Sequence, residues 1–194
     1  MKSTILTLSI LLLAIPGLVM AQEEGAKEEA AHEKEHAHEH AAEMVKMPTA
    51  AVAVLASTSG SDVKGVIMLK QEDGYVHLTG KVINLEPGEH GFHIHEFGDL
   101  TKADGTAAGG HFNPDGHEHG APGAESHVGD LGNITADDSG VAKIDIKAEG
   151  LKLHIVLGRS IVVHAKADDL KSQPSGDAGP RVGVGVIGIA KPAE

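Results

Sequence analysis

Residues 63–97 read VKGVIMLKQEDGYVHLTGKVINLEPGEHGFHIHEF. Two turn signals, QEDG and EPGE, separate three runs in which apolar residues are grouped or alternate with polar ones: Val63–Leu69, Tyr75–Leu85 and Gly91–Phe97. Alternation with a period of two, bounded by Gly, Pro and Asp, is typical of antiparallel strands joined by short turns. The pattern predicts an antiparallel sandwich or barrel.

The same pattern continues on both sides of this stretch. Strands are expected over residues 51–55, 129–135, 141–146, 151–156, 160–165 and 181–190. Two polar, Gly-rich regions interrupt it, residues 98–128 and 166–180. Loops of such length in a compact domain are usually functional. The prediction is an all-β domain of about eight strands with two long functional loops and no convincing helix.

Composition limits the function. The chain of 194 residues has room for one domain with tails, and its 25 glycines suit short strands and tight turns. The formal net charge of −12 argues against a nucleic-acid partner, which needs clustered Lys and Arg. The absence of Cys excludes disulfides, thiolate metal sites and a Cys nucleophile. Any metal must therefore be held by His and carboxylate.

The N-terminal 47 residues differ from the rest. Residues 1–21 carry Lys2, an apolar run and small residues before Gln22, which predicts a signal peptide. The pattern does not favour a membrane anchor, because the apolar run is short and no basic residues directly follow it. We expect an exported protein, periplasmic or secreted, with no stable membrane insertion. Residues 22–47 are rich in Glu, Ala and His, which predicts a disordered leader. Its histidines suit acquisition of copper or zinc. The domain is expected to span residues 48–194.

Histidines gather around the fourth expected strand and the first long loop. His93 and His95 stand two residues apart, so their imidazoles project from one face of a strand. Such a pair is weak evidence for a metal site by itself, because two surface histidines on a strand would show the same spacing. Further imidazoles and a carboxylate lie in the flexible backbone beyond, followed by one imidazole on a later strand: His111, His119, His127, Asp130 and His164. A set of this kind suits zinc and copper.

Five motifs together resemble one family, the copper/zinc superoxide dismutases. They are GFHIHEFGD at 91–99, GGHFNP at 109–114, HVGDLGNI at 127–134, GRSIVVHAKADDL at 158–170 and GDAGPRVGVGVIGIA at 176–190. The resemblance covers nearly all of residues 50–190 in family order. It implies an eight-stranded antiparallel Greek-key β-barrel, an immunoglobulin-like sandwich whose two long loops carry the active site.

The resemblance also implies a role for individual residues. Copper would be held by His93, His95, His111 and His164, and zinc by His111, His119, His127 and Asp130, with His111 bridging the two ions. Asp168 matches the carboxylate that links copper and zinc ligands, and Arg181 matches the arginine beside copper that attracts the anionic substrate.

The implied reaction is dismutation of superoxide to O2 and H2O2, an antioxidant defence in an exported compartment. Copper would be alternately reduced and oxidised, while zinc would act as a structural and electrostatic partner. His111 would exchange a proton with the product.

The remaining histidines of the domain are expected to bind no metal. His90 matches a structural histidine of the family, and His77 and His154 are expected to be surface or packing residues. His117 lies two residues before His119 and could compete for zinc, but the step from His119 to Gly120 matches the family and favours His119.

The chain departs from the family in two ways. Relatives usually carry a disulfide between positions that are here Gly105 and Val184, and the second loop is shorter than in many of them. A lysine that often guides superoxide there has no clear counterpart, although Lys166 and Lys171 could substitute. A non-catalytic copper or zinc buffer and a purely structural barrel are the alternatives to an enzyme. Dimers are common in the family, and the sequence leaves the oligomeric state open.

Overall fold

A computed structural model describes residues 47–123 and 125–191. The predicted signal peptide and all of the predicted leader before Met47 lie outside the described residues. Within them, no helix has the length and hydropathy needed to cross a membrane.

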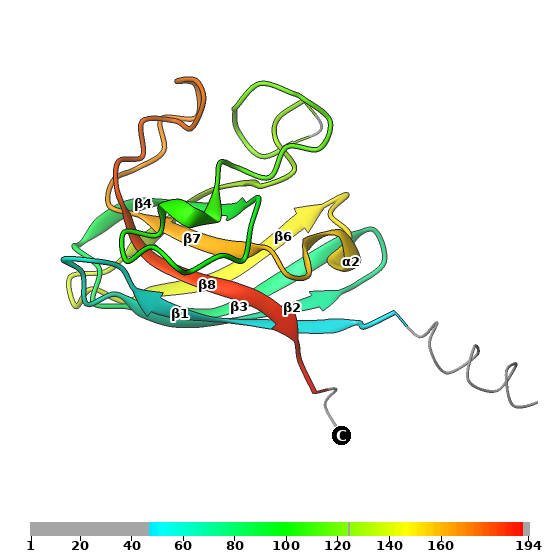
Figure 1. Cartoon of the computed structure of the whole chain (residues 1–194), viewed down its shortest axis with the longest axis horizontal. Coiled ribbons are helices and arrows are strands. Elements are labelled where there is room, and N and C mark those ends of the chain that lie inside the picture. The colour runs from blue at the N-terminus through cyan, green and yellow to red at the C-terminus, as the bar shows by residue number, and fades with distance from the viewer. Residues whose placement is uncertain (1–46, 124, 192–194) are drawn as a thin grey trace, which may run out of the picture. The chain divides into compact units, whose positions relative to one another are not determined.

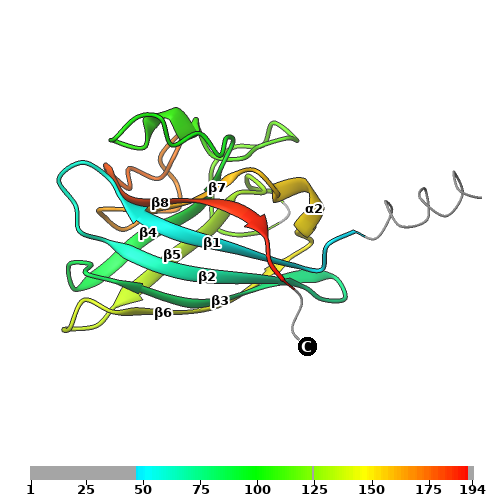
Figure 2. The ribbon, with the colours of Figure 1, turned by 60° about the horizontal axis from the view of Figure 1, so that its bottom comes forward.

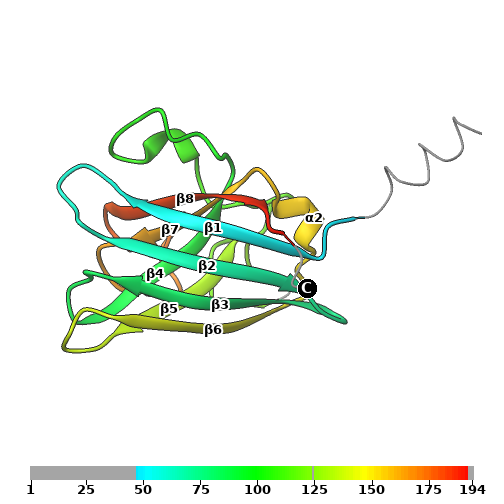
Figure 3. The ribbon, with the colours of Figure 1, turned by 90° about the horizontal axis from the view of Figure 1, so that it is seen from below.

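Eight antiparallel strands close into a barrel, as predicted (Figure 1). The strands are β1 (Ala50–Ser57), β2 (Lys64–Gln71), β3 (Tyr75–Ile83), β4 (Gly88–His95), β5 (Asp130–Ala136), β6 (Ala142–Glu149), β7 (Ser160–His164) and β8 (Arg181–Ile189). Their order around the barrel is β1-β2-β3-β6-β5-β4-β7-β8. Figures 2 and 3 show β1, β2, β3 and β6 side by side on one wall, with β4, β5 and β7 behind them.

Alternation along each strand decides which side chains fill the barrel. On β1, Ala51, Ala53 and Leu55 are buried while Val54 is 63% exposed. On β4, Phe92 and Ile94 belong to the central apolar cluster. Because successive side chains of a strand point to opposite faces, His93 and His95 must lie on the outer side of the barrel wall. They are nevertheless fully buried, so something outside the barrel covers them.

The prediction of a strand over residues 151–156 is wrong, because Leu153–Val156 form a short helix, α2. Leu153 and Val156 are its buried residues, a spacing of three that fits one turn of helix. A short apolar run does not distinguish a buried strand from a buried helical turn by periodicity alone, which explains the error. The described residues contain one further helical turn, the 3-10 helix η1 (Thr106–Ala108).

The two long loops cover the outer face of β4 and β7. The first connects β4 to β5 and the second connects β7 to β8, and both lie over the same side of the barrel in Figures 1 and 2. The loops also touch each other, because the backbone N–H of His119 in the first loop donates to the side chain of Gln173 in the second. His93 and His95 thus lie between barrel wall and loops.

Candidate metal centre

Two strands and the first loop bring four histidines together. β4 supplies His93 and His95, and its neighbour β7 ends at His164. His111, in the loop, forms an isolated bridge with His95 and so comes alongside β4. The ligand nitrogens of His93, His95, His111 and His164 lie within 4.8 Å of one another; we call these four residues the first group.

Hydrogen bonds at the far side of each ring fix which nitrogen of the first group carries a lone pair. Nδ1 of His95 donates to the carbonyl of Gly109, and Nδ1 of His164 donates to the carbonyl of Gly179. The nitrogen–oxygen distance is 3.0 Å in each hydrogen bond. In the neutral rings the two Nε2 atoms are then both acceptors, yet they face each other at 3.4 Å. Two lone pairs directed at one point are the arrangement that a cation between them satisfies.

Burial keeps the rings neutral. It lowers the pKa of His164 to about 3, and the neighbouring His93 acts in the same direction. Burial also lowers the pKa of His95 well below its usual value. For His93, burial lowers the pKa and outweighs the opposing hydrogen bond to Asp168. Imidazoles must be unprotonated to bind a metal, so near neutral pH these rings are ready to bind one.

The first loop and the start of β5 form a second group. It consists of His111, His119, His127 and Asp130, whose ligand atoms also lie within 4.8 Å of one another. Nδ1 of His119 lies 3.1 Å from Oδ2 of Asp130, and Nδ1 of His127 lies 3.2 Å from Oδ1. His111 belongs to both groups: its Nδ1 is 2.8 Å from Oδ1 of Asp130, and its Nε2 is buried without a hydrogen-bond partner.

Asp168 ties one histidine of each group to the other. Its Oδ2 accepts from Nε2 of His93 at 2.7 Å, and its Oδ1 accepts from Nε2 of His119 at 2.9 Å. Burial acts to raise the pKa of Asp168, but hydrogen bonds from His93, the Leu170 amide and His119 together hold the pKa well below its usual value. The ionised carboxylate therefore keeps the proton of both rings on Nε2 and leaves Nδ1 of both free.

Four of these nitrogens are buried without a hydrogen-bond partner: Nδ1 of His93, Nε2 of His111, Nδ1 of His119 and Nδ1 of His127. A buried polar atom without a partner costs about 1–3 kcal/mol, and proteins rarely collect several in one place without a ligand. All four belong to the two groups. The donor set, imidazoles plus one carboxylate and no thiolate, fits copper at the all-imidazole group and zinc at the group with Asp130.

Arg181, the first residue of β8, lies next to the first group. Its guanidinium donates to the carbonyls of Gly105 and Gly109 in the first loop. Gly109 is also the residue whose carbonyl accepts from His95, so one peptide oxygen positions both side chains. The two hydrogen bonds use two of the five N–H donors of a guanidinium and leave three for an anion.

The positions that lack the family disulfide lie side by side. A Cβ added to Gly105 would be 2.8 Å from Cγ2 of Val184. Val184 packs with Ala108 and Val162 in a small apolar cluster of its own. This cluster and the hydrogen bond from Arg181 to Gly105 hold the loop where relatives have a covalent bond.

The other histidines within residues 47–123 and 125–191 lie outside both groups. His117 is exposed and its Nδ1 lies 3.1 Å from the carbonyl of Ser126, whereas His119 is buried. Both ring nitrogens of His90 face carbonyls, of His164 and Glu86, so His90 fastens β4 to β7. His77 pairs with Asp145 at the surface, and His154 is exposed on α2.

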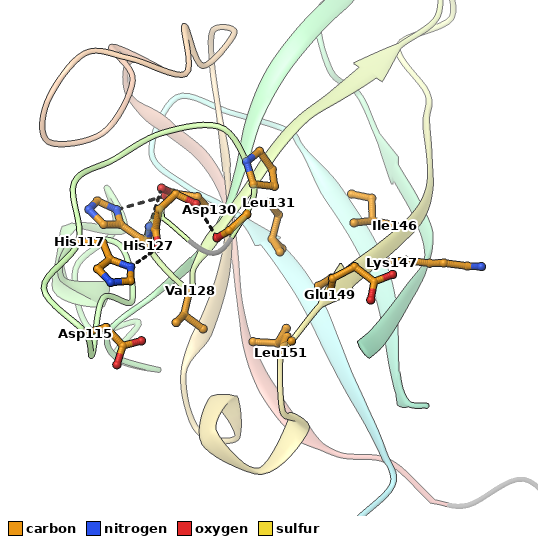
Figure 4. Close-up of a pocket in the computed structure, with 15 residues that line it drawn as sticks. Asp115, His117, His127, Val128, Asp130, Leu131, Ile146, Lys147, Glu149 and Leu151 are labelled. Atoms are coloured by element: carbon orange, nitrogen blue, oxygen red, sulfur yellow. Dashed lines mark hydrogen bonds and ion pairs between the residues drawn. The ribbon is translucent and has the colours of Figure 1, made fainter. Parts of the chain in front are cut away.

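A pocket of about 300 Å³ lies between the first loop and β6 (Figure 4). His117, His127 and Asp130 lie on its loop side, and Ile146, Glu149 and Leu151 lie opposite. Its lining includes neither Arg181 nor any residue of the first group. The pocket therefore lies apart from Arg181 and the first group.

Two amide side chains, of Asn133 and Gln173, support the groups without being expected ligands. Asn133 on β5 donates to the carbonyl of Asp168 and accepts from its backbone N–H. Gln173 holds the backbone of His119 in the same two-sided way. Asn133 lies inside the HVGDLGNI motif, which was a signal for it. Gln173 lies in the second loop between the last two motifs, so no motif pointed to it.

Comparison with known proteins agrees with this geometry. Residues 63–187 match the family model described as copper/zinc superoxide dismutase (SODC). A protein of Arabidopsis thaliana named superoxide dismutase [Cu-Zn] 3 is 45% identical over 155 residues, which cover 74% of this chain and 93% of that protein. The crystal structure of the clock protein EA4 superposes with a TM-score of 0.67 at 41% identity, over 74% of this chain and 96% of that one.

Proposed function

The chain belongs to the copper/zinc superoxide dismutase family, and we propose that it converts two superoxide anions and two protons to O2 and H2O2. The observation that carries the proposal is the convergence of buried imidazole nitrogens without partners into two groups that share His111. We assign copper to His93, His95, His111 and His164, and zinc to His111, His119, His127 and Asp130.

Arg181 would bind the substrate. Its guanidinium is held by two carbonyls of the first loop beside His95, and its remaining N–H groups can donate to an anion. A cation fixed in this position favours superoxide over neutral O2, so it promotes entry of the substrate and exit of one product.

His111 would handle a proton. Its Nε2 is buried without a hydrogen-bond partner, and Asp130 holds its Nδ1. We expect Nε2 to hold a proton in one half of the cycle and return it to the departing peroxide in the other. Copper bound at the first group supplies the one-electron oxidation and reduction that no amino-acid side chain here provides.

A metal buffer is the alternative, and Arg181 argues against it. A protein that only stores or delivers copper has no need of a guanidinium anchored beside the copper ligands. We further propose that residues 1–21 direct export, to a periplasm or outside the cell, and that residues 22–47 gather copper or zinc for the domain at 48–194. Both rest on the sequence alone.

The test of the enzyme is superoxide dismutation by protein loaded with copper and zinc. His93→Ala removes one nitrogen of the first group and should abolish the activity. His154→Ala is the matched control, because it removes an exposed imidazole on α2 outside both groups. Equal rates for parent and His93→Ala would refute the proposal.

We also propose that the chain forms a homodimer through the outer face of β1, β2 and β8. Val54 pairs with Val66 across β1 and β2, Val186 lies on the neighbouring β8, and all three are exposed. Contiguous exposed apolar side chains mark interaction surfaces. Val54→Glu should yield monomers in sedimentation velocity, whereas Thr135→Glu, on the exposed face of β5, should not; an unchanged dimer in Val54→Glu would contradict the assignment.

A further inference from the structure

The side-chain amide of Gln173 connects the second loop to one residue of the first. Its Oε1 accepts from the backbone N–H of His119 and its Nε2 donates to the carbonyl of the same residue. The donor–acceptor distance is 2.9 Å in both hydrogen bonds. Nε2 also donates to the carbonyl of Lys171 at 3.2 Å, which fixes the amide within its own loop. Gln173 is exposed, so its conformation is set by these hydrogen bonds and not by packing in a core.

The second loop holds His119 at a third atom as well. Asp168, at the start of the same loop, accepts from Nε2 of His119. The peptide N–H, the carbonyl and the ring of His119 are thus all bound by residues 168–173. Since ring and backbone are both fixed, Nδ1 of His119 has one direction available, toward Asp130.

The loop closes tightly over this arrangement. A Cβ on Gly176 would lie 1.8 Å from Oδ1 of Asp168 and 2.7 Å from Nε2 of His119. The side chains of His119 and Asp168 are both fully buried as a result. Gln173 is the side chain in this short loop that reaches the backbone of the first loop.

We infer that Gln173 is a positioning residue for the second metal group: it holds His119 in the orientation that retains zinc and couples the second loop to zinc occupancy. This rests on the proposed function, since it requires zinc at the second group. Residues that orient a metal ligand typically change affinity by about 10–100-fold when they are removed.

The experiment compares Gln173→Met with Gln71→Met. Methionine keeps the approximate length of the side chain and removes the hydrogen bonds. Gln71 is a matched control because its amide also makes three hydrogen bonds to backbone, from Leu153 N–H and to the carbonyls of Glu72 and Tyr75, at the far end of β2. Both substitutions therefore remove the same kind and number of contacts.

The measured quantities are zinc release to a chelator from the copper- and zinc-loaded protein, and the visible spectrum after cobalt replaces zinc. Gln173→Met should release zinc at least about tenfold faster and shift the cobalt bands. Gln71→Met should leave both unchanged, even if it lowers the melting temperature equally. Amide exchange at His119 should also accelerate only in Gln173→Met.

Equal zinc release by parent and Gln173→Met would overturn the inference and leave the proposed function intact. Equal acceleration in both variants would overturn it too, because Gln173 would then act through general stability. A parent that retains no zinc would overturn the proposed function and the inference with it.

Discussion

At the scale of single residues, each histidine of the two groups depends on what binds its other nitrogen. Carbonyls of Gly109 and Gly179 hold Nδ1 of His95 and His164, whereas Asp168 holds Nε2 of His93 and of His119. These partners select the tautomer and thereby the nitrogen that remains free for a metal. The chemistry of the site therefore depends on residues that bind no metal.

Asp168→Asn tests this dependence. The amide offers one acceptor where the carboxylate offers two, so either His93 or His119 would face an N–H2 group and lose its preferred tautomer. We expect retention of at least one metal to fall by about 10–100-fold, measured by competition with a chelator. Asp169→Asn, an exposed neighbour that caps a turn, is the control. Unchanged retention of both metals in Asp168→Asn would contradict the role given to the carboxylate.

The low pKa of His164 predicts that acid lowers the stability of the metal-free protein. Its pKa is about 3 in the folded state against 6.5 ordinarily, so between these pH values the unfolded chain binds more protons. The stability contributed by the neutral ring is present above pH 6.5 and is lost as the pH falls toward 3. One such group gives a slope of about 1.4 kcal/mol per pH unit.

Burial lowers the pKa of His93 and His95 as well, so the decline should be steeper than one group predicts. Urea unfolding of metal-free protein at several pH values measures the slope, and His164→Asn should flatten it. A free energy of unfolding that does not change between neutral and mildly acidic pH would contradict the prediction.

At the scale of elements, β4 supplies two histidines of the first group and the two loops bury them. Alternation on β4 sends Phe92 and Ile94 into the barrel and leaves His93 and His95 on the other face, where the loops bury them. A strand can therefore supply rigid ligands only if loops complete the enclosure. The second loop does this in few residues because glycine allows a very close approach.

Gly176→Ala should damage the loop, and Gly74→Ala should not damage the site. Both glycines have positive φ, 68° and 89°, so both substitutions carry a backbone cost of about 1–2 kcal/mol. A Cβ at Gly74 meets nothing within 4 Å, whereas one at Gly176 collides with Asp168. We expect a larger loss of melting temperature and faster zinc release in Gly176→Ala. Equal effects of the two substitutions would show that the close approach is unimportant.

At the scale of the whole molecule, the domain lacks the covalent brace usual in its family and folds around two sites built from several segments. Metals that bind only the folded state stabilise it, by about 4 kcal/mol at a thousand times the dissociation constant. For a domain of this size that corresponds to roughly 10 °C or more. We expect the melting temperatures of metal-free and loaded protein to differ by at least this much, as calorimetry would show; a difference of a few degrees would refute it.

Restoring the disulfide should reduce this dependence on metal. In the double variant Gly105→Cys, Val184→Cys, the oxidised form should be more stable than the reduced form by about 2–4 kcal/mol without metal. The reduced form is the matched control, because it carries the same strain from the positive φ at residue 105. Denaturant unfolding of both forms measures the difference. Identical midpoints would mean that these neighbouring positions cannot be bridged usefully.

Much of the fold followed from patterns within single segments. The period of two from Val63 to Phe97 predicted the hairpins, because alternation is a local property that reports directly which face of a strand is buried. The one wrong strand, at 151–156, lies where a short apolar run fits strand and helix equally. The local sequence does not distinguish the two structures. The helix is favoured because Leu153 and Val156 both pack into the apolar core.

The sequence by itself determined the all-β class, the two long loops, the absence of thiols and the histidines that stand together in family motifs, since all of these are written in composition and spacing. Only the tertiary structure decided which nitrogen of each ring is free, that Gly109 serves both His95 and Arg181, and that Gln173 holds His119. Those contacts join residues far apart in the chain. Their geometry exists only after the barrel has closed and the two loops have met over it.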